Sequence, residues 1–403
     1  MQDATRHYIN GGWVASIDGR EMAVENPSTE EKIATICLGG AADADAAVAA
    51  AKAAFPAWAA TDPLDRIAAL ERLMEVYKGQ AEDMAQAISS EMGAPIALAK
   101  TAHVGSGAGH LKNTIRTAKA FVFERPLGDH APSDMILYEP VGVCALITPW
   151  NWPMNQVMLK VAPALAAGCT VILKPSELSP LSAILLAKMI DAAGFPSGVF
   201  NLVNGDGAGV GEHLTAHPDV DMVSFTGSTR AGVAISKAAA ETVKRVSLEL
   251  GGKGANIIFA DADEKAVTRG VRHCFNNSGQ SCNAPTRMLV ERAIYDQAVE
   301  TARTIAEKTE VGPADIEGRQ IGPVVSEAQF NKIQFLIKRG IDEGAKLIAG
   351  GLGRLERLNQ GYFVRPTIFA NVTQDMTIWK EEIFGPVLCI TPFDSEEKAI
   401  TLA

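Results

Sequence analysis

Short apolar segments alternate with helical segments between residues 141 and 251, and this rhythm constrains the fold more than any other feature. Two intervening stretches, 182–193 and 229–240, have helical periodicity. Such alternation predicts parallel βαβ units, and therefore an α/β fold with a doubly wound, Rossmann-like parallel sheet. The expected strands are 141–148, 170–174, 199–203, 222–226 and 246–250.

The 403-residue chain is long enough for more than one domain. A second α/β region is expected from about residue 255, with a strand at 255–259, a helix at 264–275 and a strand at 287–290. Before the first of these regions, 121–123 and 135–138 flank a polar stretch with Gly and Pro, which predicts a protruding β-hairpin. We therefore expect one domain over 1–120 and 142–253, a hairpin over 121–141, and a second domain over 254–403.

Composition excludes several classes of protein. A net charge of -10 and a pI of about 5.3 argue against a nucleic-acid partner. No apolar run reaches the roughly 18 residues of a membrane span, and no signal region follows the N-terminus. The six cysteines form no C-x-x-C pair, so neither a metal site nor a disulfide framework is predicted, and a cytoplasmic location fits. Cys144, Cys169 and Cys389 lie in apolar runs and are expected to be inert core.

Cys282 differs from these cysteines because it lies in the polar stretch Asn-Ser-Gly-Gln-Ser-Cys-Asn. A thiol in a polar, Gly-containing loop is a candidate nucleophile. Upstream, Glu249 stands between two leucines and before two glycines. An acid in apolar surroundings tends to have a raised pKa, which suits a general base. For each residue alone, a structural role is an equal alternative.

Polar residues follow several predicted strands, where ligands of doubly wound sheets bind. Asn151 can donate a side-chain N–H to an oxyanion, or it can simply form a turn before a Pro-initiated helix. Gly227 and Ser228 precede a helix whose first N–H groups favour a diphosphate, although a tight turn is the favoured explanation of these two residues alone. Lys174 and Glu177 can bind ribose hydroxyls, and the carboxylate disfavours a 2′-phosphate, so NAD is expected rather than NADP. For this tetrapeptide alone, a solvated lysine and a helix-start glutamate are the favoured alternative.

These residues fall in motifs that occur in one order: Pro-Trp-Asn at 149–151, Lys-Pro-Ser-Glu at 174–177, Phe-Thr-Gly-Ser-Thr at 225–229, Leu-Glu-Leu-Gly-Gly-Lys at 248–253, Gly-Gln-Ser-Cys at 279–282 and Glu-Glu-Ile-Phe-Gly-Pro at 381–386. On the basis of these six motifs, the chain resembles the NAD(P)-dependent aldehyde dehydrogenase superfamily from near residue 7 to its end.

The resemblance implies roles for the motif residues. Cys282 would attack an aldehyde, Asn151 and the backbone N–H of Cys282 would hold the oxyanion, and Glu249 would activate the water that releases the acid. The residues implied to bind the cofactor are Trp150, Lys174, Glu177, Gly227, Ser228, Glu382 and Phe384. It further implies a dinucleotide-binding domain, a catalytic domain that carries the thiol, and a hairpin that forms a homodimer or homotetramer.

Two departures from the family pattern bear on activity and substrate. Relatives run several tens of residues further, so a C-terminal tail is expected to be missing. Around Trp152, where relatives that act on apolar aldehydes have bulky apolar residues, this chain has the amides Asn155, Gln156, Asn276 and Asn283. These amides predict a polar aldehyde, unless they bond to one another or to the backbone.

Two alternatives stay open at this point. A coenzyme A-acylating dehydrogenase would share most motifs, although some such relatives lack the carboxylate expected at Glu249. A non-catalytic NAD-binding or structural protein of the same fold is the second alternative.

Overall fold

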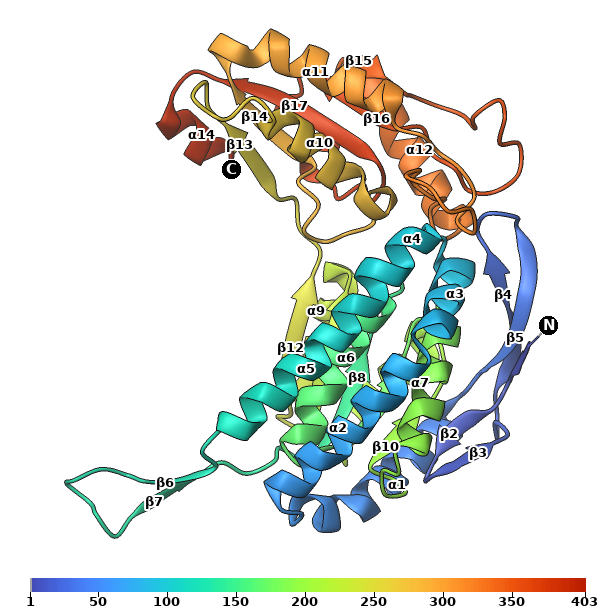
Figure 1. The fold of residues 1–403 in the computed structure, drawn as a ribbon, viewed down its shortest axis with the longest axis vertical. Helices are drawn as coiled ribbons and strands as arrows, with labels where there is room; N and C mark the ends of the chain where they lie inside the picture. The colour runs from blue at the N-terminus through green and yellow to red at the C-terminus, as the bar shows by residue number, and fades with distance from the viewer. Residues whose placement is uncertain (1) are drawn as a thin grey trace. The chain divides into compact units, whose positions relative to one another are not determined.

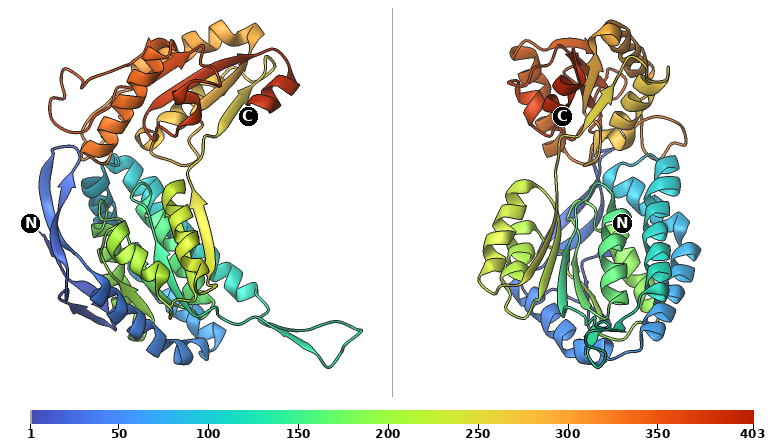
Figure 2. Two further views of the ribbon diagram at one scale, coloured as in Figure 1. Left: turned by 180° about the vertical axis from the view of Figure 1, so that it is seen from behind. Right: turned by 90° about the vertical axis from the view of Figure 1, so that its left-hand side faces the viewer.

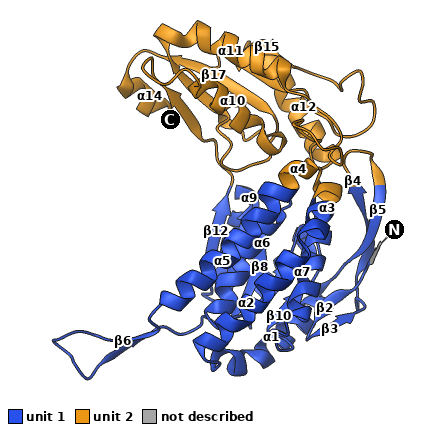
Figure 3. Ribbon diagram, viewed as in Figure 1, with its two compact units in different colours: residues 1–25, 32–88, 100–250 blue, residues 26–31, 89–99, 251–403 orange. Residues whose placement is uncertain are grey.

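The computed structural model describes residues 2–403, with side chains described from Ala4 onward. The chain forms two compact units (Figure 3). Unit 1 comprises the chain up to Glu25, Lys32–Ile88 and Lys100–Leu250, and unit 2 comprises Asn26–Glu31, Ser89–Ala99 and Gly251–Ala403. Two short segments within the range 1–120 therefore pack in unit 2 with the C-terminal part of the chain.

Unit 1 contains a seven-stranded sheet in the order β12-β11-β8-β9-β10-β2-β3. The first five of these strands pair in parallel, and β2 and β3 extend the sheet by antiparallel pairing. The strands are β8 (Val143–Ile147), β9 (Thr170–Lys174), β10 (Phe200–Leu202), β11 (Met222–Gly227), β12 (Arg245–Leu250), β2 (His7–Ile9) and β3 (Gly12–Val14). All five predicted strands of the sheet are confirmed.

Helices cover both faces of this sheet, as the right-hand view of Figure 2 shows. On one face lie α1 (Ala41–Ala59), α8 (Glu212–Ala216) and α9 (Thr229–Ala240), and the π-helical turn Gly207–Gly211 leads into α8. On the other lie α6 (Pro153–Ala166) and α7 (Leu181–Ala192), with α2 (Pro63–Gly79) and α5 (Val104–Ala120) packed outside them. The doubly wound arrangement predicted from the sequence is confirmed.

Helix α1 shows why its sequence packs on the sheet. Ala44, Ala47, Val48 and Ala51 recur at helical spacing and are buried in one core cluster with residues of β8, β9 and β11. Their short side chains let the helix backbone approach the strands closely. The start of α2 is as predicted, because the Asp62 side chain accepts a hydrogen bond from the backbone N–H of Leu64 at 2.8 Å.

A two-stranded hairpin, β6 (Glu124–Pro126) with β7 (Met135–Leu137), projects from unit 1 after α5 (Figure 1). The predicted first strand at 121–123 is wrong by three residues. Phe123 still accepts a hydrogen bond from the backbone N–H of Tyr138 at 2.9 Å, and the aromatic rings of this stretch pack on one another. Phe121 stacks edge-on against both Phe123 and Tyr138, with ring centroids 4.8 and 5.1 Å apart.

The N-terminal part also contains a small sheet and the helical elements that precede α5. A three-stranded sheet contains β1 (Gln2–Ala4), β5 (Glu31–Leu38) and β4 (Arg20–Asn26). Helix α3 (Ala81–Met92), the single turn α4 (Ile96–Leu98) and a π-helical turn at Ala99–His103 lead into α5.

Unit 2 has its own sheet in the order β13-β14-β17-β16-β15, parallel except for the last pair. Successive residues face separate cores, so Leu289 packs with α12 and α14, while Met288 and Val290 pack with α10 and α11. The strands are β13 (Ala255–Ile258), β14 (Arg287–Glu291), β15 (Lys346–Ala349), β16 (Thr367–Ala370) and β17 (Val387–Phe393). The helices are α10 (Ala266–Phe275), α11 (Tyr295–Lys308), α12 (Glu327–Asp342), α13 (Thr377–Lys380) and α14 (Glu396–Leu402). Within residues 2–403, none of the helices combines the length and the apolar character that a membrane crossing requires.

Candidate active site

The register of the parallel strands aligns the predicted site residues of unit 1 along one edge of its sheet. Ile147 at the end of β8 pairs with Lys174 of β9 and Phe225 of β11, and Phe225 pairs with Leu248 of β12. Asn151, Glu177, Ser228 and Glu249 therefore all lie within four residues of this row, towards the carboxyl ends of the strands. These ends are where doubly wound sheets bind ligands.

Asn151 lies in the short connection between β8 and α6. It is buried, at 4% exposure. Pro153 occupies the first position of α6, where its missing N–H costs nothing. Trp152 is half-buried, and its indole stacks on the His103 ring with centroids 4.0 Å apart and planes 14° apart. Asn151 is thus followed by two residues whose positions are fixed by packing and backbone geometry.

Glu249 has a different environment from the one expected. Along β12 the side chains alternate, so Leu248 and Leu250 pack against the core cluster on the α1 and α9 side while Glu249 is exposed. The prediction of an acid in apolar surroundings is wrong, because neighbours in a strand point to opposite faces. The exposed position leaves the carboxylate accessible to water.

Lys160 is a charged residue near Glu249 that the sequence analysis missed. It lies on α6 among apolar side chains, is buried, and its Nζ donates to Ser224 Oγ at 2.9 Å. Burial lowers the pKa of Lys160 to about 8, although the negative charge of Glu249 acts in the opposite direction. The charge of Glu249 is thus close enough to act on the Lys160 ammonium group. The sequence did contain a signal for this residue, because Lys160 stands at a position of α6 where the helical spacing of apolar residues predicts burial.

The start of α9 has the features of an anion site. Ser228 is the N-cap residue, and its Oγ accepts a hydrogen bond from the backbone N–H of Ala231 at 3.3 Å. The N–H groups of Thr229 and Arg230 belong to the first turn, where a helix provides no backbone partner. Gly227 is required by packing, since a Cβ there would lie 2.5 Å from Cζ of Phe225.

Lys174 and Glu177 lie close together at the end of β9. The Lys174 Nζ is buried, donates to the carbonyls of Pro175 at 2.9 Å and Gly205 at 2.7 Å, and lies 3.9 Å from a Glu177 oxygen. Burial lowers the pKa of Lys174, and the charges of Glu177 and Asp206 oppose that shift. Two of the three ammonium donors are used within the protein, so one remains for a ligand hydroxyl. Glu177 is half-buried.

In unit 2, Cys282 lies in a loop with an unusual backbone. Asn277, Ser278 and Gly279 have consecutive positive φ angles of 51°, 56° and 74°. Buried contacts hold this conformation: Ser278 Oγ donates to the Gly322 carbonyl at 2.7 Å, and Gln280 Oε1 accepts from the backbone N–H of Val325 at 2.9 Å. Such backbone strain persists only where the surroundings enforce it, and it is concentrated at functional sites.

The thiol that this loop presents is exposed, whereas the other five cysteines of the chain are buried. The expectation of inert core positions for Cys144, Cys169 and Cys389 agrees with this burial. Cys282 is therefore the one cysteine that a solvent-borne reactant reaches.

Gly279 is the tightest point of the loop. A Cβ at this position would lie 2.0 Å from the backbone oxygen of Gly385. Phe384, next to Gly385, itself has a positive φ of 58°, and its carbonyl accepts a hydrogen bond from Gln329 Nε2 at 2.8 Å. The cysteine loop and the Phe384 turn therefore fix each other.

Glu382 contacts the glycines of the Leu-Glu-Leu-Gly-Gly-Lys motif. It accepts a hydrogen bond from the backbone N–H of Gly252 at 3.3 Å, and a Cβ on Gly251 would lie 2.2 Å from its carboxylate. Burial raises the pKa of Glu382, and the Gly252 hydrogen bond together with Lys332 and Lys253 opposes the rise. The close approach explains the glycine at position 251.

The four predicted substrate amides have different environments. Asn155 is half-buried, and its Oδ1 lies 2.5 Å from Nε2 of His110. Gln156 is buried, and its Oε1 has no hydrogen-bond partner among the described residues. Asn276 and Asn283 are exposed on either side of Cys282 in the sequence. One amide thus has a partner within the protein, as the alternative explanation requires, and another lacks one at its oxygen.

Comparison with known proteins identifies the family. The sequence profile of the aldehyde dehydrogenase family matches residues 13–403. The chain belongs to the aldehyde dehydrogenase family.

Individual relatives agree with this membership. A 3-succinoylsemialdehyde-pyridine dehydrogenase from a Pseudomonas species is 51% identical over 100% of this chain and 84% of its own length. An aldehyde dehydrogenase structure from Bartonella henselae matches with a TM-score of 0.99 and 57% identity, covering 100% of this chain and 85% of that one. Aldehyde dehydrogenase C of Pseudomonas syringae, a cysteine-to-alanine mutant complexed with NAD+ and octanal, matches with a TM-score of 0.97 and 49% identity, covering 99% and 82%.

These relatives confirm the resemblance inferred from the motifs and the α/β fold class. The chain is an enzyme that oxidises aldehydes.

The close approach at Gly279 leads to a first prediction. Gly279→Ala should lower the Tm and reduce kcat/KM for aldehyde oxidation by about 100-fold, because relieving the clash with Gly385 displaces the Cys282 loop by about 1 Å. Gly254→Ala is the matched control, since its Cβ would lie 4.0 Å from the nearest atom. Equal kcat/KM and Tm values for the two variants would contradict the account of the loop.

Proposed function

We propose that Cys282 is the nucleophile of an NAD-dependent aldehyde dehydrogenase that releases the free carboxylic acid. The observation that carries the proposal is the exposure of this thiol on a loop whose strained backbone is held by buried hydrogen bonds. The Cys282 thiolate adds to the aldehyde carbon and forms a thiohemiacetal. The buried Asn151 side chain and the backbone N–H of Cys282 donate to the oxyanion.

NAD fits the residues at the carboxyl edge of the unit 1 sheet. The N–H groups at the start of α9, with Gly227 and Ser228, suit the diphosphate. Lys174 and Glu177 suit the adenosine ribose, and the carboxylate disfavours the extra phosphate of NADP. From the family pattern we further assign Trp150, Glu382 and Phe384 to the cofactor. When bound, NAD supplies the acceptor for the hydride that leaves the thiohemiacetal carbon.

The second half-reaction is hydrolysis of the thioester left on Cys282. Glu249 removes a proton from water as the water oxygen attacks the thioester carbon. The C–S bond then breaks, which releases the acid and returns the thiol. Exposure of Glu249 gives it access to water. This supports hydrolysis over transfer to coenzyme A.

We infer an oligomeric assembly from the surface of the hairpin and a location from the free thiol. Apolar side chains on the hairpin are exposed, among them Val122 at 59%, Met135 at 51% and Leu137 at 56%. Exposed apolar side chains gathered on one element mark a contact surface, so we assign the hairpin 121–141 to a homodimer or homotetramer. A free thiol as nucleophile suits the reducing cytoplasm.

The nucleophile can be tested by substitution. Cys282→Ala should abolish aldehyde-dependent NADH formation without changing the circular dichroism spectrum, because the sulfur that forms the adduct is gone. Cys37→Ala, which removes a buried thiol elsewhere, should retain the activity. Retained activity in Cys282→Ala would point to another nucleophile, and an inactive wild-type enzyme with every aldehyde tested would favour the non-catalytic alternative. The product assay includes coenzyme A, and acyl-CoA in place of the acid would identify the acylating alternative.

We further propose that the aldehyde is polar. Asn155 and Gln156 lie on α6, the helix that follows Asn151, and both are about one helical turn beyond Trp152. The unpartnered Oε1 of Gln156 and the His110–Asn155 pair offer hydrogen bonds that an apolar chain cannot satisfy. We assign Asn276 and Asn283, which flank Cys282, to the same substrate.

The substrate class can be tested by a specificity ratio. Wild-type kcat/KM should be at least about tenfold higher for a short hydroxy-aldehyde or semialdehyde than for hexanal and benzaldehyde. Asn155→Leu should narrow or reverse this ratio, while Asn331→Leu, on an exposed position of α12, should leave it unchanged. Better turnover of the apolar pair by the wild-type enzyme would contradict the proposal.

A further inference from the structure

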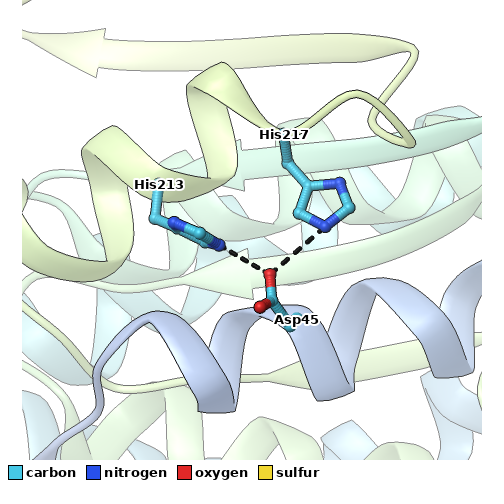
Figure 4. A group of neighbouring side chains, drawn as sticks. All are labelled: Asp45, His213 and His217. Atoms are coloured by element: carbon cyan, nitrogen blue, oxygen red, sulfur yellow. Dashed lines mark hydrogen bonds and ion pairs between the residues drawn. The ribbon is translucent and has the colours of Figure 1, made fainter.

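Three side chains that take no part in the proposed reaction meet on the surface of unit 1, where α1 lies beside α8 (Figure 4). They are Asp45 from α1, His213 from α8 and His217, which directly follows α8. Nε2 of His213 lies 2.6 Å, and Nε2 of His217 3.3 Å, from the same oxygen of Asp45. All three potential ligand atoms lie within 4.8 Å of one another.

The local sequence explains how the three side chains converge. His213 and His217 are four residues apart, the spacing that places two side chains on one face of a helical turn. Asp45 follows Ala44 on α1, and Ala44 faces the sheet, so the aspartate points away from it along the side that packs beside α8. The two imidazole rings lie 5.8 Å apart at 76°, edge to face rather than stacked. Both ring edges can therefore be directed at one point.

The hydrogen bonds of His217 fix which ring nitrogen carries the proton. Nδ1 of His217 accepts a hydrogen bond from the backbone N–H of Asp219 at 3.1 Å, so the ring proton is on Nε2, facing Asp45. Without a metal, the cluster is thus a set of hydrogen bonds from two imidazoles to one carboxylate.

We propose that Asp45, His213 and His217 bind one divalent transition-metal ion of the zinc, cobalt or nickel type. Two imidazole nitrogens and one carboxylate oxygen suit these ions, whereas magnesium and calcium prefer all-oxygen sites. Ligand atoms at about 2.0–2.2 Å from a tetrahedral ion lie roughly 3.3 Å apart, so the present separations need only small side-chain movements. The open fourth position is exposed and is filled by water.

Binding through Nε2 of His217 requires its proton to move to Nδ1. The hydrogen bond from the backbone N–H of Asp219 to Nδ1 is then lost, and this loss is a cost of binding the ion through His217.

A bound ion would join α1 to the segment that leads into β11, because His217 lies five residues before that strand. Both parts contribute to the same core cluster. An ion that binds the folded form alone stabilises it in proportion to its occupancy. The consequence is therefore greater thermal stability of unit 1, independent of the reaction at Cys282.

The test uses untagged full-length protein with Cys282→Ser, which removes the exposed thiol that would otherwise bind the same ions. Titration with Co²⁺ should give visible d–d absorption bands of a tetrahedral site at one equivalent per chain, and Zn²⁺ should displace them. Calorimetry should give a micromolar Kd for Zn²⁺, and Zn²⁺ should raise the Tm in a manner reversed by EDTA.

Variants assign the ligands. His213→Asn and His217→Asn should each weaken Zn²⁺ binding by more than about tenfold, because each removes one ligand atom. His130→Asn, an exposed histidine on the hairpin, is the control and should bind normally. Absence of d–d bands and of a Zn²⁺-dependent Tm change in the Cys282→Ser protein, or unchanged binding in His213→Asn, would overturn the proposal and leave a hydrogen-bonded cluster only.

Discussion

The hydrogen-bonded register of β12, β11, β8 and β9 is the constraint on which the site in unit 1 depends. Because Ile147 is level with both Phe225 and Lys174, and Phe225 with Leu248, four connections leave the sheet at the same edge. A shift of one residue in any strand would turn its side chains to the opposite face. Buried apolar residues on both faces of the central strands prevent that shift.

Unit 2 meets a different requirement, the presentation of a thiol on a short loop. Strand pairing cannot do this, and three successive left-handed residues do it instead. Their conformational cost, of order 1–3 kcal/mol for each residue other than glycine, is offset by the buried bonds of Ser278 and Gln280. Glycine is needed at positions 251 and 279 because another part of the chain lies where a Cβ would be.

Much of this could be predicted from the sequence because strand and helix periodicity is local. Patterns of neighbours within a few residues indicate the five parallel strands of the unit 1 sheet, the start of α2 and the polar loop of Cys282. Two errors arose where distant residues decide: Phe121 packs against Tyr138 beside the displaced strand, and the partner of Lys160 lies 64 residues away. The exposure of Glu249 is a different error, because it follows from the local alternation along β12. The cluster of Asp45 with His213 and His217 was missed because its ligands come from segments more than 160 residues apart.

The central claim is that a covalent acyl group forms on Cys282 and that Glu249 is needed to remove it. Its most direct measurement is intact-protein and peptide mass spectrometry of Glu249→Gln after mixing with NAD and a substrate aldehyde. The account predicts a burst of about one NADH per active site, and an added acyl mass that persists on the peptide containing Cys282. An acyl group on a different residue, or steady turnover at the wild-type rate with no adduct on Cys282, would contradict it.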